Sequence, residues 1–150
     1  MTGTLADRLA LLVSAFNAHS LDVPDALLDR ACVFRLNGVA YEETMGRPVT
    51  DPIVRLVARG SAAYRFLAQA LWYAVPDAEV SLDPLVPEDG NRVPLASTMA
   101  TVQGTLRGSE GRFRAKVAVA LVIGESGLVQ EVAAMMSEEQ LEAIREARRQ

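Results

Sequence analysis

The stretch GRFRAKVAVALVIGESGLVQEVAAMM, residues 111–136, predicts the central feature of the fold, an antiparallel pair of long strands. In its first part, Arg112, Arg114 and Lys116 alternate with apolar residues. A period of two is typical of a strand with one face toward solvent and the other toward the core. The turn GESG at 124–127 then reverses the chain, so a second strand follows directly.

Upstream, residues 78–106 show the same period. The sequence AEVSLDPLVPEDGNRVPLASTMATVQGTL predicts two further strands around the turn PEDGN at 87–91. Pro84, Pro87 and Pro94 predict bends in a curved sheet, because proline is tolerated mainly at strand edges and bulges. The alternation in the strand at 92–104 is compatible with either face pointing inward.

Helical spacing dominates the first half of the chain. Apolar residues at 5, 9, 12, 13 and 16 predict a first helix, and LDVPDALLDRA at 21–31 predicts the start of a second, with Pro24 near its first turn. A short strand, CVFRLNGV at 32–39, follows and ends at a glycine. A third helical segment runs from about 52 to 73, and Gly60 can break or kink it.

Residues 137–150 predict a C-terminal helix that begins with a capping-box pattern at Ser137. Helices followed by long antiparallel strands are the layout of an α+β domain. We expect one domain over residues 1–150, in which a cone-shaped, strongly curved, mainly antiparallel sheet wraps around the N-terminal helices. Residues 136–150 are expected to form a helical extension. The mouth of such a cone is a natural small-molecule pocket.

Composition excludes several classes of function. A net charge of -4, from 15 basic and 19 acidic residues, provides no basic face for nucleic acid. Neither a signal-peptide layout nor a membrane-spanning apolar run occurs, so a cytoplasmic protein without membrane contact is expected. The single cysteine, Cys32, cannot form an internal disulfide and is expected to be buried and inert. His19 is the only histidine and no nucleotide-binding motif is present, so neither a metal nor a cofactor is expected.

Six segments in this order and spacing resemble the nuclear transport factor 2-like superfamily, and within it the branch of SnoaL-like polyketide cyclases and ketosteroid isomerases. They are FNAHSLDVPDALL (16–28), ACVFRLNG (31–38), MGRPV (45–49), VPDAEVSLDPLVPEDGNRV (75–93), STMATVQGTL (97–106) and GRFRAKVAVALVIGESGLVQEV (111–132). The resemblance implies a cystatin-like α+β barrel with an apolar interior that binds small molecules. It also implies a homodimer formed through the outer face of the sheet.

The same resemblance argues against two known mechanisms. A ketosteroid isomerase uses a carboxylate base, a protonated acid and a phenol. The matching positions hold Arg35, Val119 and, in the first helix, Leu12 or Ser14. The related epoxide hydrolases need an Asp–Arg–Asp arrangement, for which the strand VPLASTMATVQG at 93–104 offers no charged residue.

Arg35 and Asn37 are the candidate catalytic residues. They lie two apart in CVFRLNGV and share one strand face with Val33, which we expect to line the cavity. Arginine offers a fixed array of donors, and the amide of Asn37 can donate and accept beside it. The alternative is a structural salt bridge or amide network, for instance between Arg35 and a carboxylate such as Asp29, Glu42 or Glu43.

Apolar and aromatic side chains are expected to bind the substrate. Aromatic residues on the third helix and methionines near the strands can instead be ordinary core. The expected substrate-binding residues are Val33, Tyr64, Trp72, Tyr73, Met99, Val117, Val119, Leu121, Val132 and Met136.

Three functions are compatible with this pattern. The first is a cyclase or isomerase of a hydrophobic polyketide-type molecule that acts by holding the substrate in a reactive conformation, for example in a cycloaddition. The second is a non-catalytic module that binds a hydrophobic ligand or mediates dimerisation. The third is an isomerase or dehydratase that uses a relocated acid, Glu42, Glu43 or Asp51.

Overall fold

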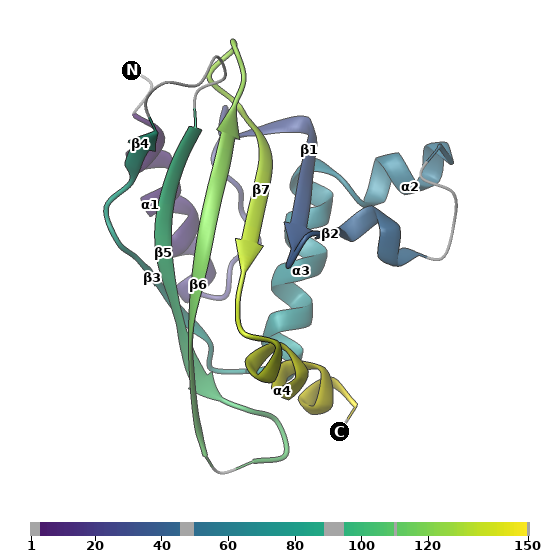
Figure 1. The fold of residues 1–150 in the computed structure, drawn as a ribbon, viewed down its shortest axis with the longest axis vertical. Coiled ribbons are helices and arrows are strands. Elements are labelled where there is room, and N and C mark those ends of the chain that lie inside the picture. Colours follow the sequence, from purple (N-terminus) through teal and green to yellow (C-terminus); the bar gives the residue numbers. More distant parts are fainter. Residues whose placement is uncertain (1–3, 46–49, 89–94, 110, 150) are drawn as a thin grey trace.

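One curved sheet forms the body of the computed structural model, with strand order β2-β1-β7-β6-β5-β3 and β4 paired to β5 (Figure 1). The structure describes residues 4–45, 50–88, 95–109 and 111–149. The strands are β1 Leu28–Leu36, β2 Val39–Ala40, β3 Glu79–Leu82, β4 Val86–Glu88, β5 Leu95–Thr105, β6 Arg112–Ile123 and β7 Val129–Met135. The helices are α1 Leu5–Asn17, α2 Pro52–Val57, α3 Gly60–Ala74 and α4 Glu138–Arg148, with a 3-10 helix, η1, at Tyr41–Met45.

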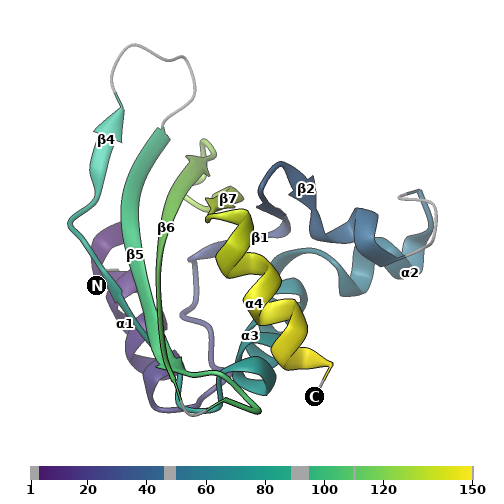
Figure 2. The same ribbon diagram turned by 60° about the horizontal axis from the view of Figure 1, so that its bottom comes forward.

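The sheet is mainly antiparallel, as predicted, and its one parallel pair joins β1 to β7. The helices α1 and α3 lie on the same side of the sheet, and α4 follows β7 and packs beside α3 (Figures 1 and 2). The α+β cone expected from the sequence is therefore confirmed. Within the described residues, no helix combines the length and apolar character needed to cross a membrane.

The β6–β7 hairpin follows the predicted alternation. Phe113, Ala115 and Val117 are buried, whereas Arg112 and Arg114 are exposed on the opposite face. The even-numbered residues of β5 from Ala96 to Gly104 are the buried ones, which settles which face of this strand points inward.

Two local predictions need correction. Residues 21–31 do not form a helix: a turn in which Ala26 has a φ of 60° leads into β1 at Leu28. Pairing with β7 explains the difference, because the Val129 N–H donates to the carbonyl of Leu27 (2.8 Å) and strand pairing continues from Leu28. The sequence predicted one strand between residue 78 and the PEDGN turn. The structure has two short strands there, β3 and β4, which are separated at residues 83–85, where Pro84 lies.

The other helix boundaries agree with the sequence. The predicted break at Gly60 separates α2 from α3. The Ser137 hydroxyl caps α4 by accepting from the Gln140 N–H (3.2 Å), but the Gln140 side chain donates to the Arg114 carbonyl instead of closing a capping box. Parts of the predicted MGRPV segment and PEDGN turn, and Pro94, lie outside the described residues.

Cys32 is fully buried beside Leu27, Leu121 and Val129. Burial, with smaller contributions from Asp29 and Glu131, raises the pKa of the Cys32 thiol from 9.0 to about 12. Because the thiolate is the reactive form, its fraction at pH 8 should fall about 1,000-fold. We expect Ellman's reagent to label the native protein far more slowly than the same protein unfolded in guanidinium. Equal labelling rates would show that Cys32 is accessible.

Candidate functional site

A cavity of about 290 Å³ lies between the concave face of the sheet and the helices α1 and α3. Every residue of its lining is hydrophobic except Tyr64 and Thr98. The lining comprises Leu9, Leu12, Val13, Phe16, Leu28, Phe34, Tyr64, Leu67, Ala68, Leu71, Val80, Leu82, Thr98, Val119, Leu121, Val129 and Val132.

Strand register explains how distant segments build this wall. Val132 of β7 lies between Phe34 of β1 and Leu121 of β6, and Thr98 of β5 lies opposite Val119 of β6. Because residues opposite each other in neighbouring strands share a face, these five side chains form one continuous surface. Four strands therefore contribute to a single apolar wall.

Four of the predicted substrate-binding residues line the cavity, namely Tyr64, Val119, Leu121 and Val132. The others lie elsewhere. Val117 is buried in the adjoining core, against which Trp72 and Met136 pack. Met99 is exposed on the outer face of β5, and Tyr73 is exposed beneath the Arg107 guanidinium, 4.3 Å from the ring centre.

Arg35 lies outside the cavity lining. Phe34 points inward, so the face that carries Val33 and Arg35 is the other side of β1. Arg35 donates to the Glu131 carboxylate of β7 (2.6 Å), and the two side chains are 39% and 32% exposed. An ion pair was the predicted alternative, but its partner is neither Asp29, Glu42 nor Glu43.

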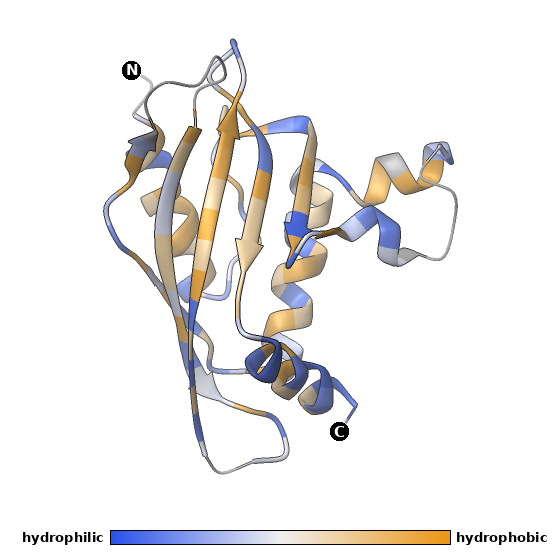
Figure 3. Cartoon of the chain, viewed as in Figure 1, coloured by the Kyte–Doolittle hydropathy of each residue, from blue (hydrophilic) through white to orange (hydrophobic). Residues whose placement is uncertain are grey.

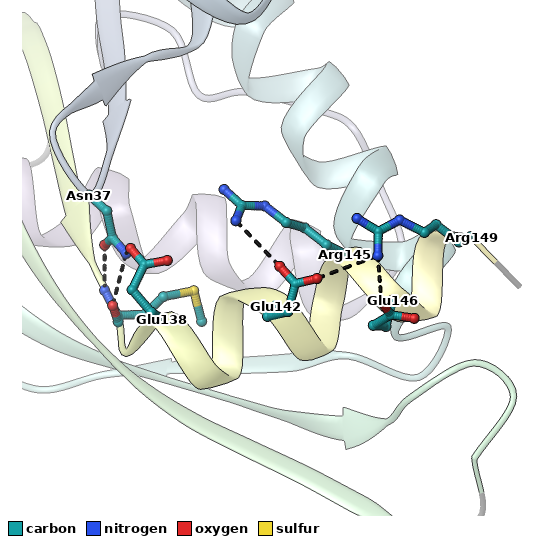
Figure 4. A network of polar contacts seen from close by, with 7 residues as sticks. Asn37, Glu138, Glu142, Arg145, Glu146 and Arg149 are labelled. Atoms are coloured by element: carbon teal, nitrogen blue, oxygen red, sulfur yellow. Dashed lines mark hydrogen bonds and ion pairs between the residues drawn. The ribbon is translucent and has the colours of Figure 1, made fainter.

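Asn37 ties the end of β1 to the start of α4 (Figure 4). Its amide donates to the Met136 carbonyl (3.0 Å) and accepts from the Met136 N–H (2.9 Å). It also donates to the Glu138 carboxylate (3.1 Å). These contacts place Asn37 in a structural role at a position with a φ of 50°.

The relocated acids proposed from the sequence also lie outside the cavity lining. Glu42 is buried and accepts two hydrogen bonds from Arg59, at 2.7 and 3.1 Å. Asp51 caps α2 by accepting from the Ile53 N–H (2.9 Å), and Glu43 is exposed. Among the described lining residues, none carries a carboxylate, an imidazole or a cationic group.

The two polar side chains of the described cavity wall, Thr98 and Tyr64, differ in whether their hydroxyls have a hydrogen-bond partner. The Thr98 hydroxyl donates to the Asp83 carbonyl (2.6 Å). The Tyr64 hydroxyl is buried and has no hydrogen-bond partner among the described residues. Burial raises the pKa of Tyr64 to about 12, so the phenol keeps its proton near neutral pH.

An aromatic stack lies beside the cavity. The Trp72 ring stacks on Phe16, which lines the cavity, and on His19, with ring centres 4.9 Å apart in both cases. Trp72 is the only tryptophan. Its fluorescence therefore reports on changes close to the cavity wall.

Sequence reasoning missed Phe34 and most residues of the α1 wall. The apolar pair Cys32 and Phe34 signalled the inward face of β1, since a buried face selects apolar side chains. Similarly, the helical spacing of Leu9, Leu12 and Phe16 marked the face of α1 that now closes the cavity.

Replacing Arg35 with alanine should lower the free energy of unfolding only slightly, because the ion pair with Glu131 is partly exposed and screened by solvent. We expect ligand binding to be unchanged, since the side chain lies outside the cavity lining. Glu131→Gln is the matched control and should show a similar small loss in chemical denaturation. Loss of ligand-induced stabilisation in Arg35→Ala, but not in Glu131→Gln, would show that Arg35 contributes to ligand binding.

No protein-family model matches the sequence, and no curated protein sequence matches it. Solved structures match along nearly the whole chain. An NTF2-like protein of unknown function from Exiguobacterium sp. 255-15 is 15% identical, with a TM-score of 0.61 over 90% of this chain and 99% of its own. A SnoaL-like polyketide cyclase from Agrobacterium tumefaciens strain C58 is 13% identical, with a TM-score of 0.61 over 94% of this chain and 97% of its own.

IdmH, a proposed polyketide cyclase from Streptomyces antibioticus, is 19% identical, with a TM-score of 0.63 over 96% of this chain and 99% of its own. The TM-scores of 0.61–0.63 over 90–96% of this chain establish a common fold. They confirm, for the fold, the resemblance drawn from the sequence.

Proposed function

From the NTF2-like fold that this chain shares with SnoaL-like polyketide cyclases, we propose that it binds a hydrophobic polyketide-type molecule and promotes its cyclisation or isomerisation. The observation that carries the proposal is the apolar cavity of about 290 Å³ enclosed by the sheet, α1 and α3. Small-molecule sites usually measure about 300–1,000 Å³, so the cavity favours a compact ligand.

The composition of the wall favours catalysis by conformational restraint. With no charged group among the described lining residues, proton transfer has no evident acid or base. An apolar pocket of this shape can still hold a flexible chain with its reacting atoms close together, which removes much of the entropic barrier to ring closure. A cycloaddition, which needs little proton transfer, fits this wall best.

A ligand screen with a cavity-filling variant tests the proposal. Thermal shift and Trp72 fluorescence would be measured with linear polyenes, cyclised polyketides and terpenoid epoxides. A ligand at a hundredfold excess over its dissociation constant should stabilise the protein by about 2.7 kcal/mol. Mass spectrometry and chromatography of the binding class would then detect a change in ring connectivity.

Val119→Phe should abolish this stabilisation, because the larger ring occupies the cavity. Val86→Phe makes the same substitution at a position that is 58% exposed and should leave binding intact. Ligand binding that survives in folded Val119→Phe would contradict the proposal.

The second candidate function is ligand binding without turnover. The same absence of acids and bases from the described wall favours it. Stabilisation by a ligand that is recovered chemically unchanged, under conditions in which its cyclised isomer is also bound, would support this alternative over catalysis.

The outer face of the sheet supports a proposed homodimer. Met99, Ala118 and Met135 lie side by side across β5, β6 and β7, with Met135 62% exposed and Met99 36% exposed. Figure 3 shows β6 hydrophobic along its upper part and hydrophilic toward its lower end. A contiguous exposed apolar surface on a sheet is typical of an interface.

Ala118→Arg should therefore convert the dimer to a monomer in size-exclusion chromatography with light scattering. A guanidinium at the centre of the apolar row would be desolvated without a partner. Ala18→Arg, at the exposed end of α1, is the matched control and should remain dimeric. A wild-type protein that is monomeric at all concentrations would refute the proposed dimer.

A further inference from the structure

The Tyr64 hydroxyl is the one polar group of the described cavity wall that is buried and without a hydrogen-bond partner. Tyr64 lies one turn after the start of α3. A buried donor without a partner costs about 1–3 kcal/mol, and phenylalanine would line the cavity without that cost. A ligand that accepts a hydrogen bond would therefore explain the presence of this hydroxyl better than packing within the folded chain does.

We propose that Tyr64 donates a hydrogen bond to a single oxygen of a neutral, otherwise hydrocarbon-like ligand, and thereby fixes the orientation of that ligand in the cavity. The inference rests on the proposed function and narrows its substrate class. A carbonyl oxygen suits the site best, since a donor aimed at it also polarises the carbon–oxygen bond.

Thr98 shows why Tyr64 is the donor. The Thr98 hydroxyl already donates its proton to the Asp83 carbonyl, so it can offer a ligand only a lone pair. The Tyr64 proton has no such acceptor. Because burial keeps the phenol protonated, Tyr64 acts as a donor and not as a base near neutral pH.

The ligand must be uncharged because nothing in the described wall would neutralise it. Two arginines directly follow lining residues in sequence: Arg35, after Phe34, pairs with Glu131, and Arg65, after Tyr64, is exposed and donates to the Leu21 carbonyl (3.2 Å). An ion transferred into such a wall would lose its hydration without gaining a partner. A neutral ketone loses far less hydration free energy on the same transfer.

Tyr64→Phe and two probes of similar shape test the inference. The probes are 1-tetralone and tetralin, which differ by one carbonyl oxygen. We expect calorimetry of the wild-type protein to show a preference of about tenfold for the ketone, as one net hydrogen bond would give. In Tyr64→Phe the preference should disappear, while the affinity for tetralin stays within about twofold because the apolar wall is unchanged.

Two further measurements separate a ligand contact from a structural role. Infrared difference spectra with 1-tetralone labelled with carbon-13 at the carbonyl should show a lower stretching frequency in wild type than in Tyr64→Phe. Thermal unfolding of Tyr64→Phe without ligand should occur at the same or a higher temperature, since a buried hydroxyl without a partner is lost. Tyr73→Phe, on the exposed side of the same helix, should leave the ketone preference unchanged.

The outcomes distinguish the inference from the function on which it rests. A ketone preference that persists in Tyr64→Phe, or an equal loss of affinity for both probes, would overturn the role of Tyr64 and leave the cavity as a ligand site. A marked loss of stability in Tyr64→Phe would likewise overturn it, since the hydroxyl would then have a protein partner. Failure of both probes to bind the wild-type cavity would overturn the proposed function itself.

Discussion

Replacing Leu27 with alanine is expected to lower the free energy of unfolding by about 3–5 kcal/mol. Leu27 is fully buried and packs with Cys32, Leu121 and Val129. Two of these neighbours, Leu121 and Val129, also line the ligand cavity, so Leu27 supports the wall from outside. The loss combines the removed apolar contact with the void that remains, and guanidinium denaturation would measure it.

Leu11→Ala is the matched control. Leu11 is 62% exposed, so the same substitution should change stability by no more than about 0.5 kcal/mol. Similar losses in both variants would show that Leu27 does not belong to a packed core.

Replacing Gly60 with alanine should destabilise the protein by about 3 kcal/mol or more, for two reasons that add. The first is conformational: Gly60 has a φ of 64°, where a non-glycine residue costs about 1–2 kcal/mol. The second is steric, since a Cβ would lie 2.7 Å from the Arg30 carbonyl oxygen and 3.2 Å from that of Asp29. Both oxygens belong to the backbone of β1, which cannot yield without moving the strand.

Gly127→Ala separates the two contributions. Gly127 has a φ of 83° and no atom within 4 Å of its added Cβ, so this variant should show the conformational cost alone. The difference between the two variants then measures the close approach of α3 to β1. Equal losses in chemical denaturation would mean that this approach is looser than the structure shows.

The parts of the fold that sequence predicted best are those fixed by local patterns. Alternation over 112–123 identified the inner face of β6, and with it Val119 and Leu121 in the cavity wall. Ser137 marked the start of α4 because an N-cap is a local signal. The helix predicted around Pro24 was wrong because pairing of β1 with β7, about 100 residues later, outweighed a local helical pattern.

The candidate site was only partly predictable for the same reason. Arg35 and Asn37 stood out as polar residues on an apolar strand, but their partners, Glu131 and Met136, come from the far end of the chain. Nothing in the local sequence identifies such partners. Tyr64 was expected in the cavity from its aromatic ring, whereas the missing partner of its hydroxyl became visible only in three dimensions.

The parallel pairing of β1 with β7 also has a consequence for the order of folding. During synthesis β1 emerges about 100 residues before its partner strand at Val129–Met135. Such distant pairing makes closure of the sheet a slow step, because the entropy of a long loop is lost before the stabilising contacts between the two strands form. Until then Phe34 lacks Val132 as its neighbour, and the cavity wall is incomplete. The binding site is therefore complete only after β7 has been made and has paired with β1.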